Sequence, residues 1–113
     1  MAKRVLVVED EAMVAMLIED LIADLGFELA GSAATAAEGM SMARARRFDF
    51  ALLDVNLGDG ETSFEVAAFL RGRAVPFAFL TGYGPDGVRA DLRDAPILSK
   101  PVDPERLSRL LNG

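Results

Sequence analysis

Three carboxylates, a hydroxyl and an ammonium group each follow a short apolar segment of this 113-residue chain. They belong to Glu9, Asp10, Asp54, Thr81 and Lys100. If the apolar segments are parallel strands, their carboxyl ends meet at one edge of a sheet, and the five side chains converge there. Three neighbouring carboxylates repel one another, and a hard divalent cation with oxygen ligands, such as Mg2+, would relieve that repulsion. Asp54 could then accept a phosphoryl group as a nucleophile, while Lys100 and Thr81 bind the phosphoryl oxygens.

Five segments have the continuous apolar, β-branched or aromatic character of strands that are buried on both faces. They span residues 5–8, 27–33, 48–53, 76–80 and 97–98. Helical patterns alternate with them. Parallel strands need such crossover helices, so the pattern predicts an α/β fold with a parallel sheet.

The first helical pattern runs over residues 14–25, where apolar residues including Leu17 recur at helical spacing and Gly26 offers a left-handed stop. Thr35 and Glu38 have the form of a capping box that opens a second helix. Both helices are therefore predicted to cover the sheet with an apolar face.

The second half of the chain contains three further helical segments. Thr62 and Glu65 repeat the capping-box pattern, and only a short helix fits between residues 86 and 93. Asp103 is a favourable N-cap residue, and Pro104 suits the first position of the last helix. The fourth helix is therefore predicted to be short or irregular.

Five strands and five helices in alternation predict a flavodoxin-like, doubly wound, five-stranded parallel sheet in the order 2-1-3-4-5. Its switch point lies between the first and third strands, where Glu9, Asp10 and Asp54 would meet. The length is too short for two domains, so we expect residues 1–113 to form one domain.

Composition excludes several classes of function. The net charge of -6 disfavours nucleic acids and anionic membranes as partners. Absence of Cys and His excludes disulfides, thiol nucleophiles, Ser/His/Asp triads and phosphohistidine on this chain. No apolar run reaches the ~20 residues of a membrane span, and no signal segment is evident, so we expect a soluble, cytoplasmic protein. We interpret the arginines at positions 44, 46, 47, 71 and 73 as solvated helix ends.

Four motifs together resemble the receiver domain of two-component response regulators, and the resemblance covers essentially the whole chain. They are VLVVEDE near the start, LLDVNLGDG around Asp54, FLTGYG after the fourth strand and SKP after the fifth. The resemblance implies that a sensor histidine kinase or a histidine phosphotransferase phosphorylates Asp54. It further implies that Glu9, Asp10, Asp54 and the Asn56 carbonyl hold Mg2+.

The same resemblance implies roles for residues near the phosphoryl group. Thr81 and Lys100 would contact it, and the Gly82 backbone N–H could donate to it. Pro101 would follow a cis peptide bond, whereas Asn56 and Tyr83 occupy positions that tune dephosphorylation. The phrase PFAFLTGYG resembles the alphaproteobacterial receivers with a Phe-Ala-Thr-Gly-Tyr-type motif, which are often single-domain regulators of stress signalling.

Two features depart from the family pattern. Many receivers carry Tyr or Phe three residues before the strand-five lysine, whereas this chain has Ile97 there. Only eighteen residues separate Thr81 from Lys100, which predicts a remodelled signalling surface. If the subgroup assignment holds, Phe79 or Tyr83 could replace the missing aromatic.

The leading hypothesis is a stand-alone response regulator that signals to an unknown downstream protein. It is a phosphoacceptor rather than an enzyme, and a monomer for which phosphorylation-dependent dimerisation stays open. The alternatives are a phosphoryl sink or relay, and a binding module that ignores phosphorylation. A haloacid-dehalogenase-like phosphatase also uses an aspartyl phosphate and Mg2+, but its second catalytic Asp is Asn56 here.

Overall fold

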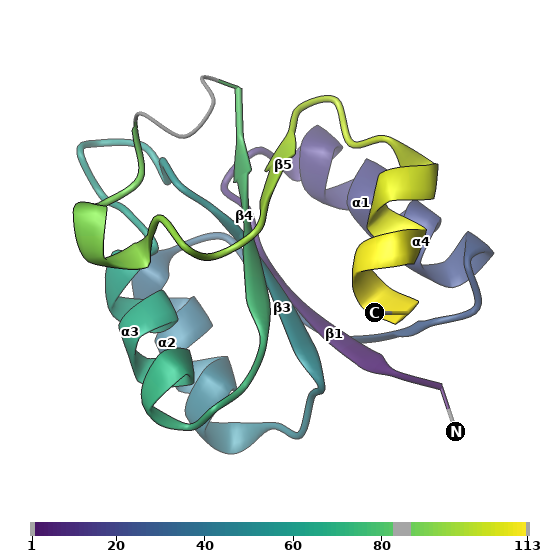
Figure 1. The fold of residues 1–113 in the computed structure, drawn as a ribbon, viewed down its shortest axis with the longest axis horizontal. Coiled ribbons are helices and arrows are strands. Elements are labelled where there is room, and N and C mark those ends of the chain that lie inside the picture. Colours follow the sequence, from purple (N-terminus) through teal and green to yellow (C-terminus); the bar gives the residue numbers. More distant parts are fainter. Residues whose placement is uncertain (1, 83–86, 113) are drawn as a thin grey trace.

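The computed structural model describes residues 2–82 and 87–112 of the chain. Five strands form one parallel sheet in the order β2-β1-β3-β4-β5 (Figure 1). They are β1 (Arg4–Val8), β2 (Glu28–Ala33), β3 (Phe50–Asp54), β4 (Phe77–Thr81) and β5 (Ile97–Ser99). The predicted doubly wound, flavodoxin-like sheet order is confirmed.

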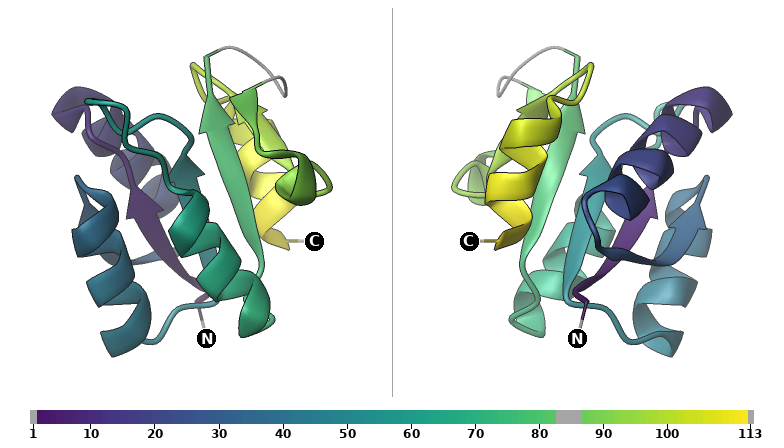
Figure 2. Two further views of the ribbon diagram at one scale, coloured as in Figure 1. Left: turned by 90° about the vertical axis from the view of Figure 1, so that its left-hand side faces the viewer. Right: turned by 90° about the vertical axis from the view of Figure 1, so that its right-hand side faces the viewer.

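Helices cover both faces of the sheet. They are α1 (Ala12–Asp24), α2 (Ala36–Ala45), α3 (Phe64–Gly72) and α4 (Pro104–Asn112). Figures 1 and 2 show α2 and α3 on one face, with α1 and α4 on the other. Residues 2–82 and 87–112 contain these four α-helices rather than five, and the 3-10 helix η2 (Ala90–Leu92) occupies the place of the predicted fourth. A single 3-10 turn suits the short connection between β4 and β5.

Alternate residues of the central strands enter two separate cores. In β1, Val5 and Val7 pack toward α1 and α4, whereas Leu6 and Val8 pack toward α2 and α3. The residues of β3 and β4 alternate in the same way. Because both faces of the sheet are covered, these strands are continuous apolar runs rather than alternating polar and apolar ones.

Local sequence signals explain most of the helix ends. The Thr35 hydroxyl accepts a hydrogen bond from the Glu38 N–H at 3.1 Å, so the first capping box is confirmed. Asp103 caps α4 by accepting from the Glu105 N–H at 3.1 Å. The second predicted capping box is wrong, because α3 begins one residue later than it requires, with Ser63 at the N-cap.

Helix α1 also departs from the sequence pattern. Ile18 and Ile22 are fully buried, but Leu17 is 63% exposed although its spacing placed it with the apolar face. Met13 and Met16 are exposed beside it. Within residues 2–82 and 87–112, the helices are too short or too polar to cross a membrane.

Candidate functional site

The chemistry-bearing side chains lie at the carboxyl edge of the sheet. Glu9 and Asp10 directly follow β1, and Asp54 is the last residue of β3. Thr81 ends β4 and pairs with Ser99, the last residue of β5. Lys100 is the next residue, and its N–H donates to the Thr81 carbonyl at 3.0 Å. The parallel order therefore brings together residues that are far apart in the sequence.

A cavity of about 410 Å3 opens at this edge. It is lined by Asp10, Glu11, Asp54, Asn56, Gly58, Thr81, Gly82 and Lys100. Six of these residues were predicted from the sequence to belong to one site. Asp54 and Thr81 are buried at the cavity wall, whereas Asp10, Glu11 and Asn56 are exposed at its mouth.

The Lys100 ammonium lies between the two buried carboxylates, at the ends of β1 and β3. Its Nζ lies 2.7 Å from Glu9 Oε1 and 3.1 Å from Asp54 Oδ2. The side chain of Glu9 is fully buried and that of Asp54 is 6% exposed, whereas Lys100 keeps 21% of its side chain exposed. Lys100 thus provides the positive charge that two buried carboxylates require.

The proximity of these groups changes their proton affinities. Burial, followed by the hydrogen bond and negative charge of Asp54, raises the pKa of Glu9 from 4.5 to about 7. Burial also acts to lower the pKa of Lys100, but hydrogen bonds to Glu9 and Asp54 outweigh it and the pKa is raised. Lys100 is therefore a stable cation here, whereas Glu9 holds its proton more tightly than an exposed glutamate does.

The three carboxylates of Glu9, Asp10 and Asp54 fit a divalent metal ion. One oxygen from each lies within 4.8 Å of the others, and Asp10 is exposed at the mouth of the cavity. An all-oxygen donor set that is open to water on one side suits Mg2+, which usually retains several water ligands. Asn56 lines the same cavity, where its carbonyl is available from the loop after β3.

The loop after β3 is shaped by left-handed residues. Gly58, Asp59 and Gly60 have φ angles of +82°, +52° and +76°. A Cβ atom at Gly58 would lie 3.3 Å from Asp10 Oδ2, so glycine also leaves room for that carboxylate. The loop closes through an antiparallel bridge between Asn56 and Thr62.

The residues expected to respond to phosphorylation are only partly described. The Lys100–Pro101 peptide bond is cis, as the resemblance implied, and Tyr83 lies outside the described residues. Phe79 is fully buried and makes edge-to-face contacts with Phe64 and Phe77, at centroid distances of 5.9 and 5.6 Å. This packing disfavours Phe79 as a mobile replacement for the missing aromatic.

Sequence reasoning missed two residues of the cavity wall. Glu11 lines the cavity and donates its N–H to Glu9 Oε2 at 3.3 Å, which helps to orient that carboxylate. Gly58 also lines the cavity, although its sequence motif assigned it no role there. The glycine-rich segment after Asp54 was the sequence signal that could have indicated Gly58. Its proximity to Asp10 could not be read from the sequence, because Asp10 follows a different strand.

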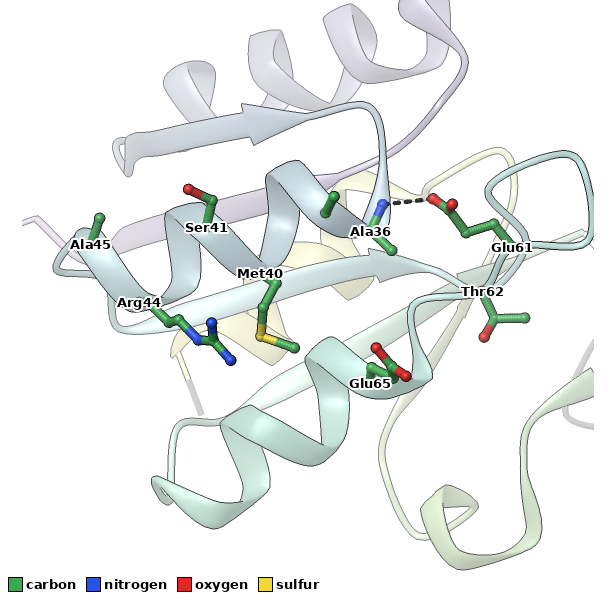
Figure 3. Close-up of a pocket in the computed structure, with 9 residues that line it drawn as sticks. Ala36, Met40, Ser41, Arg44, Ala45, Glu61, Thr62 and Glu65 are labelled. Carbon is green, nitrogen blue, oxygen red and sulfur yellow. Dashed lines mark hydrogen bonds between the residues drawn. The ribbon is translucent and has the colours of Figure 1, made fainter.

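A larger groove, of about 860 Å3, lies between α2 and α3 (Figure 3). Glu61 stands at one end, where it accepts a hydrogen bond from the Ala36 N–H at 2.8 Å, and Arg44 extends toward α3 at the other. The lining combines alanines and Met40 with these charged groups and contains no lysine. The groove therefore lacks the buried carboxylate in contact with a lysine ammonium that is found at the sheet edge.

Comparison with known proteins agrees with this geometry. The family model of the response regulator receiver domain matches residues 5–112. The chain belongs to this family. Receiver domains are signalling modules of two-component systems, and the acidic cluster at the sheet edge corresponds to the pocket where they typically bind Mg2+.

Individual relatives place this receiver domain near two named regulators. It is 32% identical to the phyllosphere-induced regulator PhyR of Methylorubrum extorquens, over 99% of this chain but only 43% of PhyR. The chain thus spans less than half the length of that curated relative. The solution structure of SdrG from Sphingomonas melonis Fr1 is 37% identical, has a TM-score of 0.87 and is matched over 94% of its length and 98% of this chain. A BeF3-activated conformation of SdrG is 38% identical with a TM-score of 0.82, covering 96% of this chain and 92% of that one.

Proposed function

We propose that this receiver domain accepts a phosphoryl group on Asp54 from a histidine kinase or a histidine phosphotransferase and then signals by binding another protein. The observation that carries the proposal is the position of the Asp54 carboxylate. It lies 3.1 Å from the Lys100 ammonium, in a cavity that Thr81 and two further acidic residues also line. This arrangement combines a nucleophile with groups suited to phosphoryl oxygens.

The transfer forms one bond and breaks another. An Asp54 carboxylate oxygen attacks the phosphorus, the P–N bond to the donor imidazole breaks, and the imidazole nitrogen that leaves is protonated from solvent. Lys100 and the Thr81 hydroxyl would then bind phosphoryl oxygens, together with the Gly82 N–H. Mg2+ held by Glu9, Asp10, Asp54 and the Asn56 carbonyl would supply charge stabilisation for the developing negative oxygens.

Phosphorylation would also redistribute the existing ion pairs. Lys100 is shared between Glu9 and Asp54, and a phosphoryl group on Asp54 would offer it a more highly charged acceptor. Lys100 directly follows β5, and its backbone N–H donates to the Thr81 carbonyl at the end of β4. A change in the partners of the Lys100 side chain can therefore move the ends of β4 and β5. We expect the protein-binding surface to change in that region.

An exposed apolar surface on α1 suits a protein phosphodonor. It consists of Met13, Met16 and Leu17, which are 79%, 61% and 63% exposed. These residues lie on α1, which begins directly after Glu11 of the cavity wall. A donor that docks on this surface would place its phosphohistidine near Asp54. Apolar contacts with α1 would give the donor affinity that does not depend on contacts inside the phosphorylation site.

The relatives support the same function. SdrG, which matches this chain over nearly its full length, has a BeF3-activated conformation. We infer that beryllofluoride, which mimics a phosphoryl group, also binds at Asp54 here. PhyR is described as a regulator, and in Bartonella quintana as an anti-anti-sigma factor, which favours a regulatory protein partner for this chain.

The direct test is phosphorylation of the purified chain by phosphoramidate and Mg2+, followed by intact mass measurement. We expect the mass gain of one phosphoryl group, its loss in Asp54→Asn, and strong inhibition by EDTA. Asp59→Asn is the matched control, because it makes the same change in a nearby exposed loop. Equal labelling of Asp54→Asn would contradict the assignment of the acceptor.

Amide-resolved NMR with Mg2+ and beryllofluoride would separate the remaining functions. Shifts that spread from Asp54 along β4 and β5 indicate a switch, whereas shifts confined to the cavity favour a phosphoryl sink or relay. Absence of any shift would favour a binding module that ignores phosphorylation. Sustained hydrolysis of a phosphomonoester would instead indicate a phosphatase.

A further inference from the structure

A third hollow lies at the opposite edge of the sheet from Asp54, where β1 begins and where α2 and α3 end. Its volume is about 730 Å3, and the phenyl rings of Phe48 and Phe69 contribute to its lining. We call it the basic groove, because five of its lining residues are basic and one is acidic. The basic residues are Lys3, Arg4, Arg46, Arg47 and Arg73. This excess of positive charge stands out on a chain whose net charge is -6.

Few of these cations are neutralised by the protein itself. Arg4 lies 3.9 Å from a Glu28 carboxylate oxygen, and the Lys3 ammonium donates to the Leu111 carbonyl. In contrast, Arg46, Arg47 and Arg73 have no carboxylate within ion-pair distance in the described part of the chain. Three exposed guanidinium groups therefore share the groove without counter-ions from the protein.

Phe69 holds part of this charge in a fixed arrangement. The guanidinium carbon of Arg73 lies 4.6 Å from the ring centroid of Phe69, and that of Arg44 lies 5.6 Å from it. Such stacking orients a guanidinium while its N–H groups stay available for a carboxylate. Arg44 also reaches the groove between α2 and α3, so the positive charge extends along the ends of both helices.

The helix dipole alone does not explain this arrangement. Arginines near helix C-termini often interact with the last carbonyl groups, and both α2 and α3 end here. However, Arg44, Arg47 and Arg73 donate no hydrogen bond to any described carbonyl, and Arg46 donates instead to Ala30 of β2 at 2.9 Å. The N–H groups of Arg44, Arg47 and Arg73 thus make no hydrogen bond to a carbonyl within residues 2–82 and 87–112 and can serve an external partner.

We infer that the basic groove binds an acidic segment of a partner protein that carries apolar as well as acidic side chains. Carboxylates would pair with Arg46, Arg47 and Arg73, while an apolar side chain would contact Phe48 and Phe69. Because the groove lies at the edge opposite Asp54, this binding should not require phosphorylation. It would hold a partner on the domain while the other edge changes its state.

Charge distribution favours a short acidic segment over a nucleic acid. A nucleic acid carries negative charge along its whole length and would extend past the groove toward Glu28 and the rest of a chain with a net charge of -6. A peptide can confine its acidic residues to the groove.

The probe for the test is a short fluorescein-labelled peptide in which glutamates alternate with leucines, titrated into the full chain. We expect amide shifts at residues 43–49 and 69–75, and affinity that falls as NaCl rises from about 50 to about 300 mM. The variant Arg47→Glu/Arg73→Glu should bind at least about tenfold more weakly. Both residues are exposed, so the fold should be kept.

The matched control is Arg106→Glu/Arg109→Glu on α4, which changes the net charge by the same amount on exposed side chains. It should bind the peptide within about twofold of the unmodified chain, because distant charges are screened by salt. Equal loss in both variants, or shifts outside the basic groove, or no shifts at high peptide concentration would overturn the inference. If a single-stranded oligonucleotide of equal charge bound more tightly than the peptide, the inference of a peptide partner would be overturned in favour of a nucleic acid. Weaker binding after beryllofluoride treatment would contradict independence from phosphorylation.

Discussion

Replacing Glu9 by Gln should stabilise the metal-free protein at pH 8 and flatten the pH dependence of its stability. Burial is the main reason that the pKa of Glu9 is raised to about 7, and Asp54 adds to it. A carboxyl whose pKa is higher in the folded than in the unfolded state binds its proton more tightly when folded. Its contribution to stability is therefore greatest below pH 4.5 and is lost as the pH rises through 7.

The size of this effect follows from the two pKa values. They are 4.5 and about 7, and each unit of difference corresponds to about 1.4 kcal/mol of unfolding free energy. The loss between pH 4 and pH 8 is therefore about 3 kcal/mol from Glu9 alone. Glutamine keeps the shape of the protonated side chain, so it can accept from Lys100 and donate to Asp54 at every pH.

The assay is urea denaturation in EDTA at several pH values between 4 and 8, followed by circular dichroism. At pH 8 we expect the unfolding free energy of Glu9→Gln to be about 2 to 3 kcal/mol higher than that of the unmodified protein. At pH 4 we expect the two unfolding free energies to be nearly equal. Glu11→Gln is the matched control, because it removes a neighbouring but exposed carboxylate. An unchanged pH slope in Glu9→Gln, or the same change in Glu11→Gln, would refute the reasoning.

Three further predictions concern the site, the donor and the core. Lys100→Ala removes the shared partner of Glu9 and Asp54, so beryllofluoride shifts in amide NMR should stay local; shifts that still spread would contradict this role. Leu17→Asp on the exposed face of α1 should slow transfer from a phosphorylated histidine kinase but not from phosphoramidate, and equal slowing would argue against docking there. Phe79→Ala should lower the unfolding free energy in urea by about 3 to 5 kcal/mol, because Phe79 is fully buried; a loss below about 1 kcal/mol would contradict its core role.

Much of the fold was predictable because its signals are local. The continuous apolar strands, the Thr35 cap and the Asp103 cap each depend on residues that are close in the sequence. The predictions that failed depend on tertiary packing instead. Leu17 has helical spacing appropriate for burial but lies on an exposed side of α1, and Ser63 rather than Thr62 is the N-cap residue of α3.

The candidate site was predictable in its members but not in its electrostatics. Glu9, Asp54 and Lys100 could be assigned to one edge, because parallel strands end there. The sequence contains no sign that Lys100 contacts both carboxylates, or that the pKa of Glu9 lies near 7. These properties depend on distances of a few ångströms and on the exclusion of water.

The basic groove shows the same limit at the other edge of the sheet. By sequence, Arg46 and Arg47 follow one helix and Arg73 follows another, so each is explained as a solvated helix end. The fold places these separate helix ends side by side and stacks Arg73 on Phe69. The sequence alone thus determined the strands, four of the helices and the edge where the acceptor lies, since hydrophobic periodicity and strand ends are local properties. Only the tertiary structure decided which charges meet, which are buried and which stay free, because these depend on packing between distant segments.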